Sequence, residues 1–394
     1  MRKNHWLCFF TLIMVLIMIP SLNAAPALAS QAPPLKASAA VLMDYTTGEI
    51  LYAKDPDERR APASTTKIMT AIVALERGKL QQKITAGPDA EKAEGTSIWL
   101  KAGETHSLEE MLYGLLLCSG NDAAVAIAEG LAGTETRYAA WMTEKARALG
   151  AESTNFVNSN GLPARNHYTT ARDLALITRY ALQNPIFDEI VKTKRKTIPW
   201  PEHSYDRLLI NHNKLLWRYS LADGVKTGYT QEAGNCLVSS ATQNGHRLVC
   251  VILNSKQIYV DSENLFKYGF DNYQLLTVVR PKEKMGAVRV TDGVRRRVPV
   301  LPEQPVTLVL PKGMADQVHV NVELPRVVEA PVEKLQPIGE LKVQLGDKLL
   351  RQVPLVSAAP VPKEGFWGKL FHWVRRFSYQ TVTLLKLIGT KAFS

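Results

Sequence analysis

Apolar residues recur at helical spacing along much of the first two thirds of the chain. Neighbours three and four residues apart in such runs mark the buried face of a helix. Gly120 and Gly150 interrupt or end runs of this kind, and Thr169 or Thr170 can cap the start of another. The predicted helices cover 108–117, 138–149, 170–182 and 265–270, with two more beginning at Ser64 and Asp122.

Other stretches alternate between apolar and polar residues, which is typical of strands, and turn residues separate them. The Asn244-Gly245 pair is a strong signal for a tight hairpin turn. Since helical and strand-like segments are interleaved, the predicted fold class is α+β. The predicted strands are a hairpin over 38–54, short strands near 83–84 and 97–99, a strand edge at 222–230, and paired strands at 236–241 and 247–253.

The last third of the chain has a different texture. After about residue 276, short Val- and Leu-rich segments recur with Pro and Gly between them, which predicts a small all-β domain. A chain of 394 residues is also too long for one ordinary core. We therefore expect a main domain over 34–275, an all-β domain over 280–353 and a Pro-rich linker over 354–365.

Both ends of the chain carry features of membrane targeting. Residues 1–29 combine a basic start, an apolar run and a small-residue cleavage site, which predicts a secretory signal peptide; the alternative is an uncleaved anchor. Residues 366–390 place Trp and Phe on one side of a basic helical pattern, which favours a helix lying in a membrane interface. The alternative there is a helix that packs on the protein.

The charge and the cysteines narrow the class of protein. A net charge of +11 indicates an anionic partner, either nucleic acid, a membrane surface or an anionic polymer, but the chain has no nucleic-acid-binding signature. Cys8 leaves with the signal peptide, and Cys118, Cys236 and Cys250 remain, an odd number without metal-site spacing. A disulfide between Cys236 and Cys250 stays open, and no metal or cofactor is predicted.

Ser64 and Lys67 lie three residues apart where a loop turns into a helix, so both side chains occupy one face. A serine hydroxyl becomes a nucleophile when a neighbouring base takes its proton, and a lysine with a lowered pKa is such a base. The helix N-terminus would also favour the oxyanion formed when Ser64 attacks a carbonyl. The alternative is an ordinary helix cap beside a solvated lysine.

Two further motifs favour a nucleophile and its base over an ordinary helix cap. Ser119-Gly120-Asn121 stands at a predicted helix–helix junction, and Lys226-Thr227-Gly228 stands on a predicted strand edge. Each alone is consistent with a plain helix break or strand end. The ordered set S-x-x-K, S-D-N and K-T-G is the signature of penicillin-binding proteins and related β-lactamases. Here the middle motif is S-G-N, and the order along the chain is the same.

On these motifs the chain resembles the low-molecular-weight penicillin-binding proteins that are serine-type D-alanyl-D-alanine carboxypeptidases of peptidase family S11. The resemblance extends to 154–158, 161–162 and 167–171. It implies a β-lactamase/DD-peptidase-like catalytic domain, an antiparallel sheet flanked by helices plus a helical lobe, followed by the small all-β domain. It also implies removal of the terminal D-alanine from peptidoglycan stem pentapeptides through an acyl-enzyme on Ser64.

The resemblance assigns a role to each motif residue. Ser64 would be the nucleophile, Lys67 its base and Ser119 a proton relay to the leaving amine. Lys226, a second cation, would lower the pKa of Lys67. The expected substrate-binding residues are Asn121, Lys226, Thr227, Gly228 and Tyr229, with the backbone N–H groups of Ser64 and Tyr229 as the oxyanion hole.

The resemblance further implies β-lactam antibiotics as covalent inhibitors and a place at the extracytoplasmic face of the bacterial cell membrane or in the cell wall, with no nucleic-acid partner. Two other functions remain open. A serine β-lactamase would need fast deacylation, usually helped by a glutamate, and no Glu-x-x-Leu-Asn element stands in 155–180. A catalytically inactive wall-binding scaffold would use the basic charge and the β-domain alone.

Overall fold

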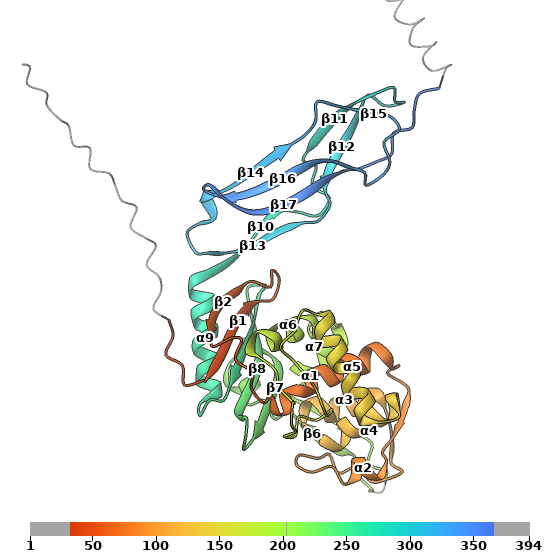
Figure 1. Ribbon diagram of the computed structural model, residues 1–394, viewed down its shortest axis with the longest axis vertical. Coiled ribbons are helices and arrows are strands. Elements are labelled where there is room, and N and C mark those ends of the chain that lie inside the picture. Colours follow the sequence, from red (N-terminus) through yellow and green to blue (C-terminus); the bar gives the residue numbers. More distant parts are fainter. Residues whose placement is uncertain (1–31, 202, 366–394) are drawn as a thin grey trace, which may run out of the picture. The chain divides into compact units, whose positions relative to one another are not determined.

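The computed structural model describes residues 32–201 and 203–365 (Figure 1). The predicted signal peptide at 1–29 and the predicted amphipathic helix at 366–390 lie outside the described residues. No helix within the described ranges is long and apolar enough to cross a membrane.

A five-stranded antiparallel sheet forms the centre of the main domain, with the strand order β2-β1-β9-β8-β7. The Asn244-Gly245 turn joins β8 to β9, and both turn residues have the positive φ that this tight hairpin requires. Strand β7 lies at the edge of the sheet, so one side of its backbone is open to pair with another strand. The strands are β1 (Ala39–Asp44), β2 (Ile50–Lys54), β7 (Ala222–Thr230), β8 (Gly234–Gln243) and β9 (His246–Leu253).

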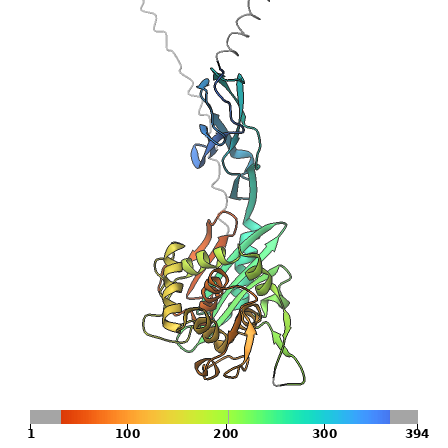
Figure 2. The ribbon, with the colours of Figure 1, turned by 90° about the vertical axis from the view of Figure 1, so that its right-hand side faces the viewer.

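The two faces of this sheet are covered by different helices, as Figures 1 and 2 show. Successive side chains of a strand point to opposite faces. Val41 and Met43 accordingly belong to the core shared with the helical lobe, whereas Leu42 packs in a second core with Phe266 of helix α9 (Ile258–Asn272). Burial on both faces fixes the register of the sheet, of which β7 is one edge strand.

The lobe is built from the helices that the apolar spacing predicts. Ser107 starts one of them with a capping box, in which its side chain and that of Glu110 each accept a backbone N–H from the other residue. Thr170 caps another through the Asp173 N–H. The helices are α1 (Lys67–Arg77), α3 (Leu108–Leu117), α4 (Asn121–Ala132), α5 (Glu135–Ala148), α6 (Ala171–Ala181), α7 (Pro185–Lys192) and the short α2 (Pro88–Glu91) and α8 (Leu215–Arg218).

Two local expectations differ from the structure. The predicted strand at 97–99 is wrong, because the backbone N–H groups of Ile98 and Leu100 donate to the Asp122 carboxylate instead of a neighbouring strand. The predicted strand near 83–84 is present and pairs with a strand that was not expected. These strands are β3 (Lys83–Thr85) and β4 (Thr105–Ser107). A further hairpin that was not expected consists of β5 (Arg195–Ile198) and β6 (Arg207–Ile210) and projects from the main domain in Figure 2.

The C-terminal part has an all-β core of its own, rich in valine and leucine. Its strands form a six-stranded sheet of order β14-β16-β17-β12-β11-β15 and the pair β10–β13. The strands are β10 (Tyr273–Val279), β11 (Gly286–Thr291), β12 (Arg297–Pro302), β13 (Val306–Pro311), β14 (Val318–Glu323), β15 (Val327–Glu329), β16 (Pro337–Leu345) and β17 (Lys348–Ser357).

The stretch 354–365 differs from the linker expected there. Strand β17 runs to Ser357, and Val361 is buried in the β-domain core and bridges Val332. Much of this proline-rich stretch is therefore packed structure, since its apolar residues fill the core. The open question of a disulfide is also answered, because Cys236 and Cys250 are free thiols that belong to the cores on opposite faces of the sheet.

Candidate active site

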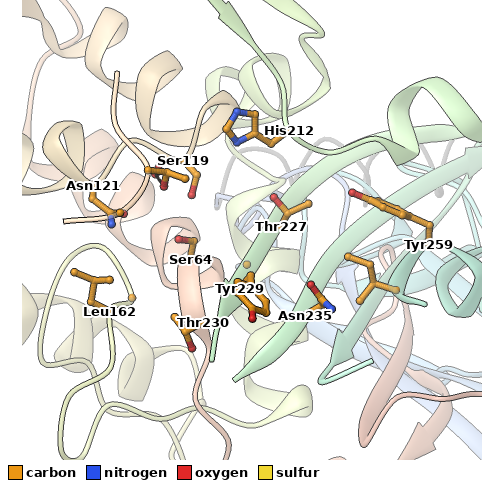
Figure 3. Close-up of a pocket in the computed structure, with 15 residues that line it drawn as sticks. Ser64, Ser119, Asn121, Leu162, His212, Thr227, Tyr229, Thr230, Asn235 and Tyr259 are labelled. Atoms are coloured by element: carbon orange, nitrogen blue, oxygen red, sulfur yellow. Dashed lines mark hydrogen bonds between the residues drawn. The ribbon is translucent and has the colours of Figure 1, made fainter. Parts of the chain in front are cut away.

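Ser64 lies in a short 3-10 turn, η1 (Ala63–Thr66), directly before α1. Ala63 has a φ of 48°, a conformation that a residue with a Cβ adopts only under constraint from its surroundings. The turn packs against β7 and β8 and presents Ser64 to a pocket of about 500 Å³. We call this the Ser64 pocket; Figure 3 shows the residues that line it.

The structure brings the eight predicted site residues together. Six of them line the Ser64 pocket, and the two lysines lie buried behind its wall. The lining residues are Ser64, Ser119, Asn121, Thr227, Gly228 and Tyr229; the buried ones are Lys67 and Lys226.

The Lys67 amine has three hydrogen-bond partners. Its Nζ lies 2.9 Å from the Ser64 Oγ, 2.6 Å from the Asn121 Oδ1 and 2.6 Å from the Asn160 carbonyl oxygen. The latter two atoms only accept hydrogen bonds. A neutral amine has two protons, so it would donate both to them and direct its lone pair at the Ser64 hydroxyl.

Burial and charge favour this neutral form. The pKa of Lys67 is well below its usual value, chiefly because burial disfavours the ammonium form and secondly because of the Lys226 charge, while Asp122 and Glu135 oppose the shift. The expectation that Lys226 would depress the pKa of Lys67 is thus confirmed. Burial also lowers the pKa of Lys226 to about 7.

A network around α4 fixes the Asn121 amide. Its Nδ2 donates to the Glu94 carbonyl at 2.5 Å, which leaves Oδ1 directed at Lys67. The neighbouring Ser119 has a φ of 62°, which is unusual for serine and turns the chain sharply into α4. Ser119 is 5% exposed and lines the pocket close to Ser64 (Figure 3).

The Asp122 carboxylate fixes the segment 97–100 beside Ser119 and Asn121, a role that the sequence reasoning missed. It accepts from the Ser97 Oγ at 2.6 Å and from the Ile98 and Leu100 backbone N–H groups at 3.0 Å. This segment directly follows Thr96, which lines the Ser64 pocket. In the sequence, Asp122 is recognisable only as an acidic residue in the first turn of a predicted helix. Acidic residues are common there because they interact favourably with the helix N-terminus.

Gly228 allows β7 to approach the nucleophile. A Cβ at this position would lie 3.0 Å from the Ser64 nitrogen and 3.1 Å from the Thr65 nitrogen, which are backbone atoms that cannot rotate away. Glycine therefore permits the close contact between η1 and the strand edge, which a larger residue would push apart. The Tyr229 side chain is 66% exposed, so its backbone rather than its ring belongs to this contact.

His167 acts as a hydrogen-bonding residue of the loop, as the sequence indicated. Its Nδ1 accepts the Val157 N–H at 3.0 Å, so Nε2 carries the proton and donates to the Thr66 Oγ1 at 2.9 Å. Burial lowers its pKa to about 4. His212, which sequence reasoning did not single out, lines the pocket, and burial and Lys226 lower its pKa.

Taken together, the pocket presents an activated hydroxyl, a buried base, a second buried cation and an open strand edge. This arrangement suits nucleophilic attack on the carbonyl of a ligand that carries a negative charge. Within the described residues, no group of three His, Cys, Asp or Glu side chains is arranged to hold a metal ion.

Comparison with known proteins agrees with this chemistry. The sequence profile described as D-alanyl-D-alanine carboxypeptidase matches residues 26–257, and that of the penicillin-binding protein 5 C-terminal domain matches 273–363. The chain is 31% identical to the D-alanyl-D-alanine carboxypeptidase DacF of Bacillus subtilis, with 84% of this chain and 87% of that protein covered. It is 33% identical to DacC of Escherichia coli, with 87% and 89% covered.

A solved structure is similar as well. Penicillin-binding protein 5 from Haemophilus influenzae has a TM-score of 0.73 and 30% identity to this chain, and the match covers 84% of this chain and 99% of that one. The similarity supports the predicted fold, a DD-peptidase-like domain followed by an all-β domain.

Proposed function

This chain belongs to the D-alanyl-D-alanine carboxypeptidase family, and we propose that the Ser64 pocket is where it carries out that reaction. The protein is a serine-type carboxypeptidase and a penicillin-binding protein, with a role in the cell wall. Its reaction removes the terminal D-alanine from peptidoglycan stem peptides through an acyl-enzyme on Ser64.

The geometry of Lys67 carries the assignment of nucleophile and base. The 2.9 Å contact with the Ser64 Oγ, together with two acceptors that take both amine protons, directs the lone pair at the hydroxyl. Ser64 forms a bond to the carbonyl carbon of the penultimate D-alanine while Lys67 takes the hydroxyl proton. The backbone N–H groups of Ser64 and Tyr229 stabilise the resulting oxyanion.

The remaining residues bind the substrate and complete the turnover. Thr227 binds the terminal carboxylate in the pocket, and Lys226 contributes its positive charge from its buried position behind Thr227. The peptide lies along the open edge of β7 beside Gly228. When the C–N bond breaks, Ser119 relays a proton to the departing amine and D-alanine leaves. Water then hydrolyses the Ser64 ester, with Lys67 again accepting a proton.

The same pocket supports slow release of a penicillin. No aspartate or glutamate is among the described residues that line the Ser64 pocket, so a dedicated carboxylate for deacylation has no support there. A penicilloyl ester on Ser64 should therefore persist. The lining of the pocket thus favours a carboxypeptidase over a β-lactamase, the first alternative function that the sequence left open.

The two ends of the chain bear on where the enzyme acts. Residues 1–29 as a signal peptide and 366–390 as a membrane-interface helix would place the enzyme at the extracytoplasmic face of the cell membrane, beside its cell-wall substrate. The support is the sequence pattern at each end of the chain and the cell-wall role of the family.

The test measures D-alanine release from a peptide that ends in D-Ala-D-Ala, together with the intact mass after exposure to a penicillin. We expect release by the unaltered protein, a persistent penicilloyl adduct, and loss of both in Ser64→Ala and Lys67→Ala. The exposed-side-chain variant Tyr229→Ala keeps its backbone N–H and should retain the adduct. Release that survives Ser64→Ala, or rapid penicillin turnover, would refute the assignment; a folded protein without any adduct would point to an inactive scaffold.

A further inference from the structure

A second pocket lies next to the Ser64 pocket and is lined by arginines. It has a volume of about 480 Å³, and its lining includes Arg59, Arg60, Arg165, Tyr168 and Glu232. We call it the arginine pocket. The reaction described above uses none of these side chains.

Three chain segments connect the two pockets. Leu162 and Thr230 line the Ser64 pocket, whereas Pro163 and Glu232, one and two residues further along, line the arginine pocket. Ala61 lines the arginine pocket three residues before Ser64. The two pockets are therefore neighbours along one continuous surface.

The direction in which the substrate lies along β7 determines whether it can reach the arginine pocket. On β7 the proposed carboxylate-binding residue Thr227 precedes the oxyanion residue Tyr229, and Thr230 follows. Figure 3 shows Thr227 and Thr230 on opposite sides of Ser64, with Leu162 on the side of Thr230. The departing D-alanine lies at the Thr227 end, so the rest of the stem peptide extends past Thr230 toward Glu232.

The end of β7 brings the substrate close to the arginine pocket. The strand ends at Thr230, and residues 231–233 form the turn to β8, so Glu232 lies in the turn directly after the strand edge. A peptide that extends along this edge would bring the side chain one or two residues ahead of the D-Ala-D-Ala pair to the arginine pocket.

Contacts with residues 168 and 169 position Arg59 and the Arg60 backbone, while two of the three arginines carry a charge without an ion pair among the described residues. Two backbone hydrogen bonds between Arg60 and Thr169, 2.8 and 2.9 Å long, fix the segment that carries Arg59 and Arg60 beside the 163–168 loop. The Arg59 guanidinium lies 4.6 Å from the centre of the Tyr168 ring. Among the described residues, neither Arg59 nor Arg165 forms an ion pair, and both are exposed to solvent.

The other charges leave an excess of positive charge. Arg60 is paired with Glu58 at 2.6 Å, but its Nε is buried and has no hydrogen-bond partner among the described residues. Glu232 is the acidic residue among those described that line the pocket. Arginine presents a planar fork of donors that matches a carboxylate.

We propose that the arginine pocket is a subsite for a carboxylate-bearing residue of the stem peptide, one or two positions ahead of the D-Ala-D-Ala pair. The inference rests on the proposed function and extends it, because it makes the enzyme select substrates by charge at a point remote from the cleaved bond. Arg59 and Arg165 would bind the carboxylate, and Arg60 would add its positive field.

The test uses two pentapeptides that end in D-Ala-D-Ala. They are identical except that the second and third residues carry free carboxylates in one and amides in the other. We expect the unaltered enzyme to prefer the carboxylate peptide by about tenfold in kcat/KM, mainly through a lower KM. In Arg59→Gln/Arg165→Gln this preference should fall to about one, while kcat/KM for the amidated peptide stays unchanged.

Glu232→Gln is the matched control. It removes a negative charge from the same pocket, so it should preserve or strengthen the preference. A loss of kcat/KM on both peptides in Glu232→Gln, with an unchanged preference in the arginine variant, would mean that the pocket binds an ammonium group and would overturn the proposal. So would an equal loss on both peptides in the arginine variant, or no preference in the unaltered enzyme.

The two proposals fail in different ways. If the unaltered protein releases D-alanine from neither peptide and forms no penicilloyl adduct, the proposed function itself is wrong and the subsite falls with it. If it releases D-alanine from both peptides at equal rates, only the subsite is wrong.

Discussion

The Lys67 amine has to be unprotonated to accept the Ser64 proton, so acylation should slow as the pH falls through its pKa. The Lys226 charge is one of the two causes that depress this pKa. Lys226→Gln removes the charge, and the pKa of Lys67 should therefore rise. We expect the acid limb of the penicillin acylation rate to move to higher pH, as measured by intact mass against time across a pH series.

The pH range of this effect follows from Lys226 itself. Burial lowers its pKa to about 7, so its charge is present mainly below that pH, and the displacement should appear there. Lys226→Arg keeps a positive charge and serves as the control, with an acid limb close to that of the unaltered protein. An identical profile in Lys226→Gln would show that burial alone sets the pKa of Lys67.

Residue spacing explains how much of this site could be predicted from sequence. Ser64 and Lys67 are three residues apart on one helical turn, so local geometry alone brings them together. The Asn160 carbonyl that takes the third Lys67 contact comes from a loop 93 residues later. A backbone acceptor has no side-chain signature, so only the folded loop reveals it.

At the scale of elements, the loop that carries His167 should make stability depend on pH. The folded pKa of about 4 lies below the ordinary 6.5, so the unfolded chain binds a proton that the folded chain rejects. Stability should be complete above pH 6.5 and fall as the pH drops toward 4. The gap corresponds to roughly 3 kcal/mol. Chemical denaturation between pH 7.5 and 4 measures it.

His167→Asn removes this titration while keeping an acceptor near the Val157 N–H. The variant should be less stable at neutral pH, but its stability should decline less steeply between pH 6.5 and 4. His319 lies exposed on β14, so His319→Asn is the control for replacing a histidine at the surface. Equal slopes in His167→Asn and the unaltered protein would contradict the burial argument.

Elements with a strong local period were predictable, and those held by distant partners were not. Most residues of α3 are buried, so its sequence carries the apolar run from which the helix was predicted. The 97–99 segment contains an apolar Ile98-Trp99 pair that resembles a strand, yet Asp122 binds its backbone. Hairpin β5–β6 is joined to the lobe by Arg207, which pairs with Glu104 at 2.8 Å in a buried contact that no periodicity announces.

At the scale of the whole molecule, the positive charge is concentrated at the ends of the sequence. Residues 1–29 contain two basic residues and 366–394 contain five, and neither segment has an acidic residue. Seven of the eleven net positive charges therefore belong to these terminal segments. The basic character of the sequence thus indicates an anionic membrane surface for the C-terminal segment more than an anionic ligand for the folded domains.

Deleting 366–394 should separate membrane binding from catalysis. We expect the unaltered protein to sediment with vesicles that contain anionic lipid, and the truncated protein to remain in solution with the same kcat/KM for D-alanine release.

Point variants separate the charge of the segment from its apolar surface. Arg375→Gln/Arg376→Gln should weaken binding to anionic vesicles alone, by about 2 kcal/mol at roughly 1 kcal/mol per charge. Trp367→Ser/Phe371→Ser should weaken binding to neutral vesicles as well, because it removes apolar surface. If the segment instead packs on the protein, the Trp367 and Phe371 substitutions would lower the melting temperature and leave vesicle binding unchanged.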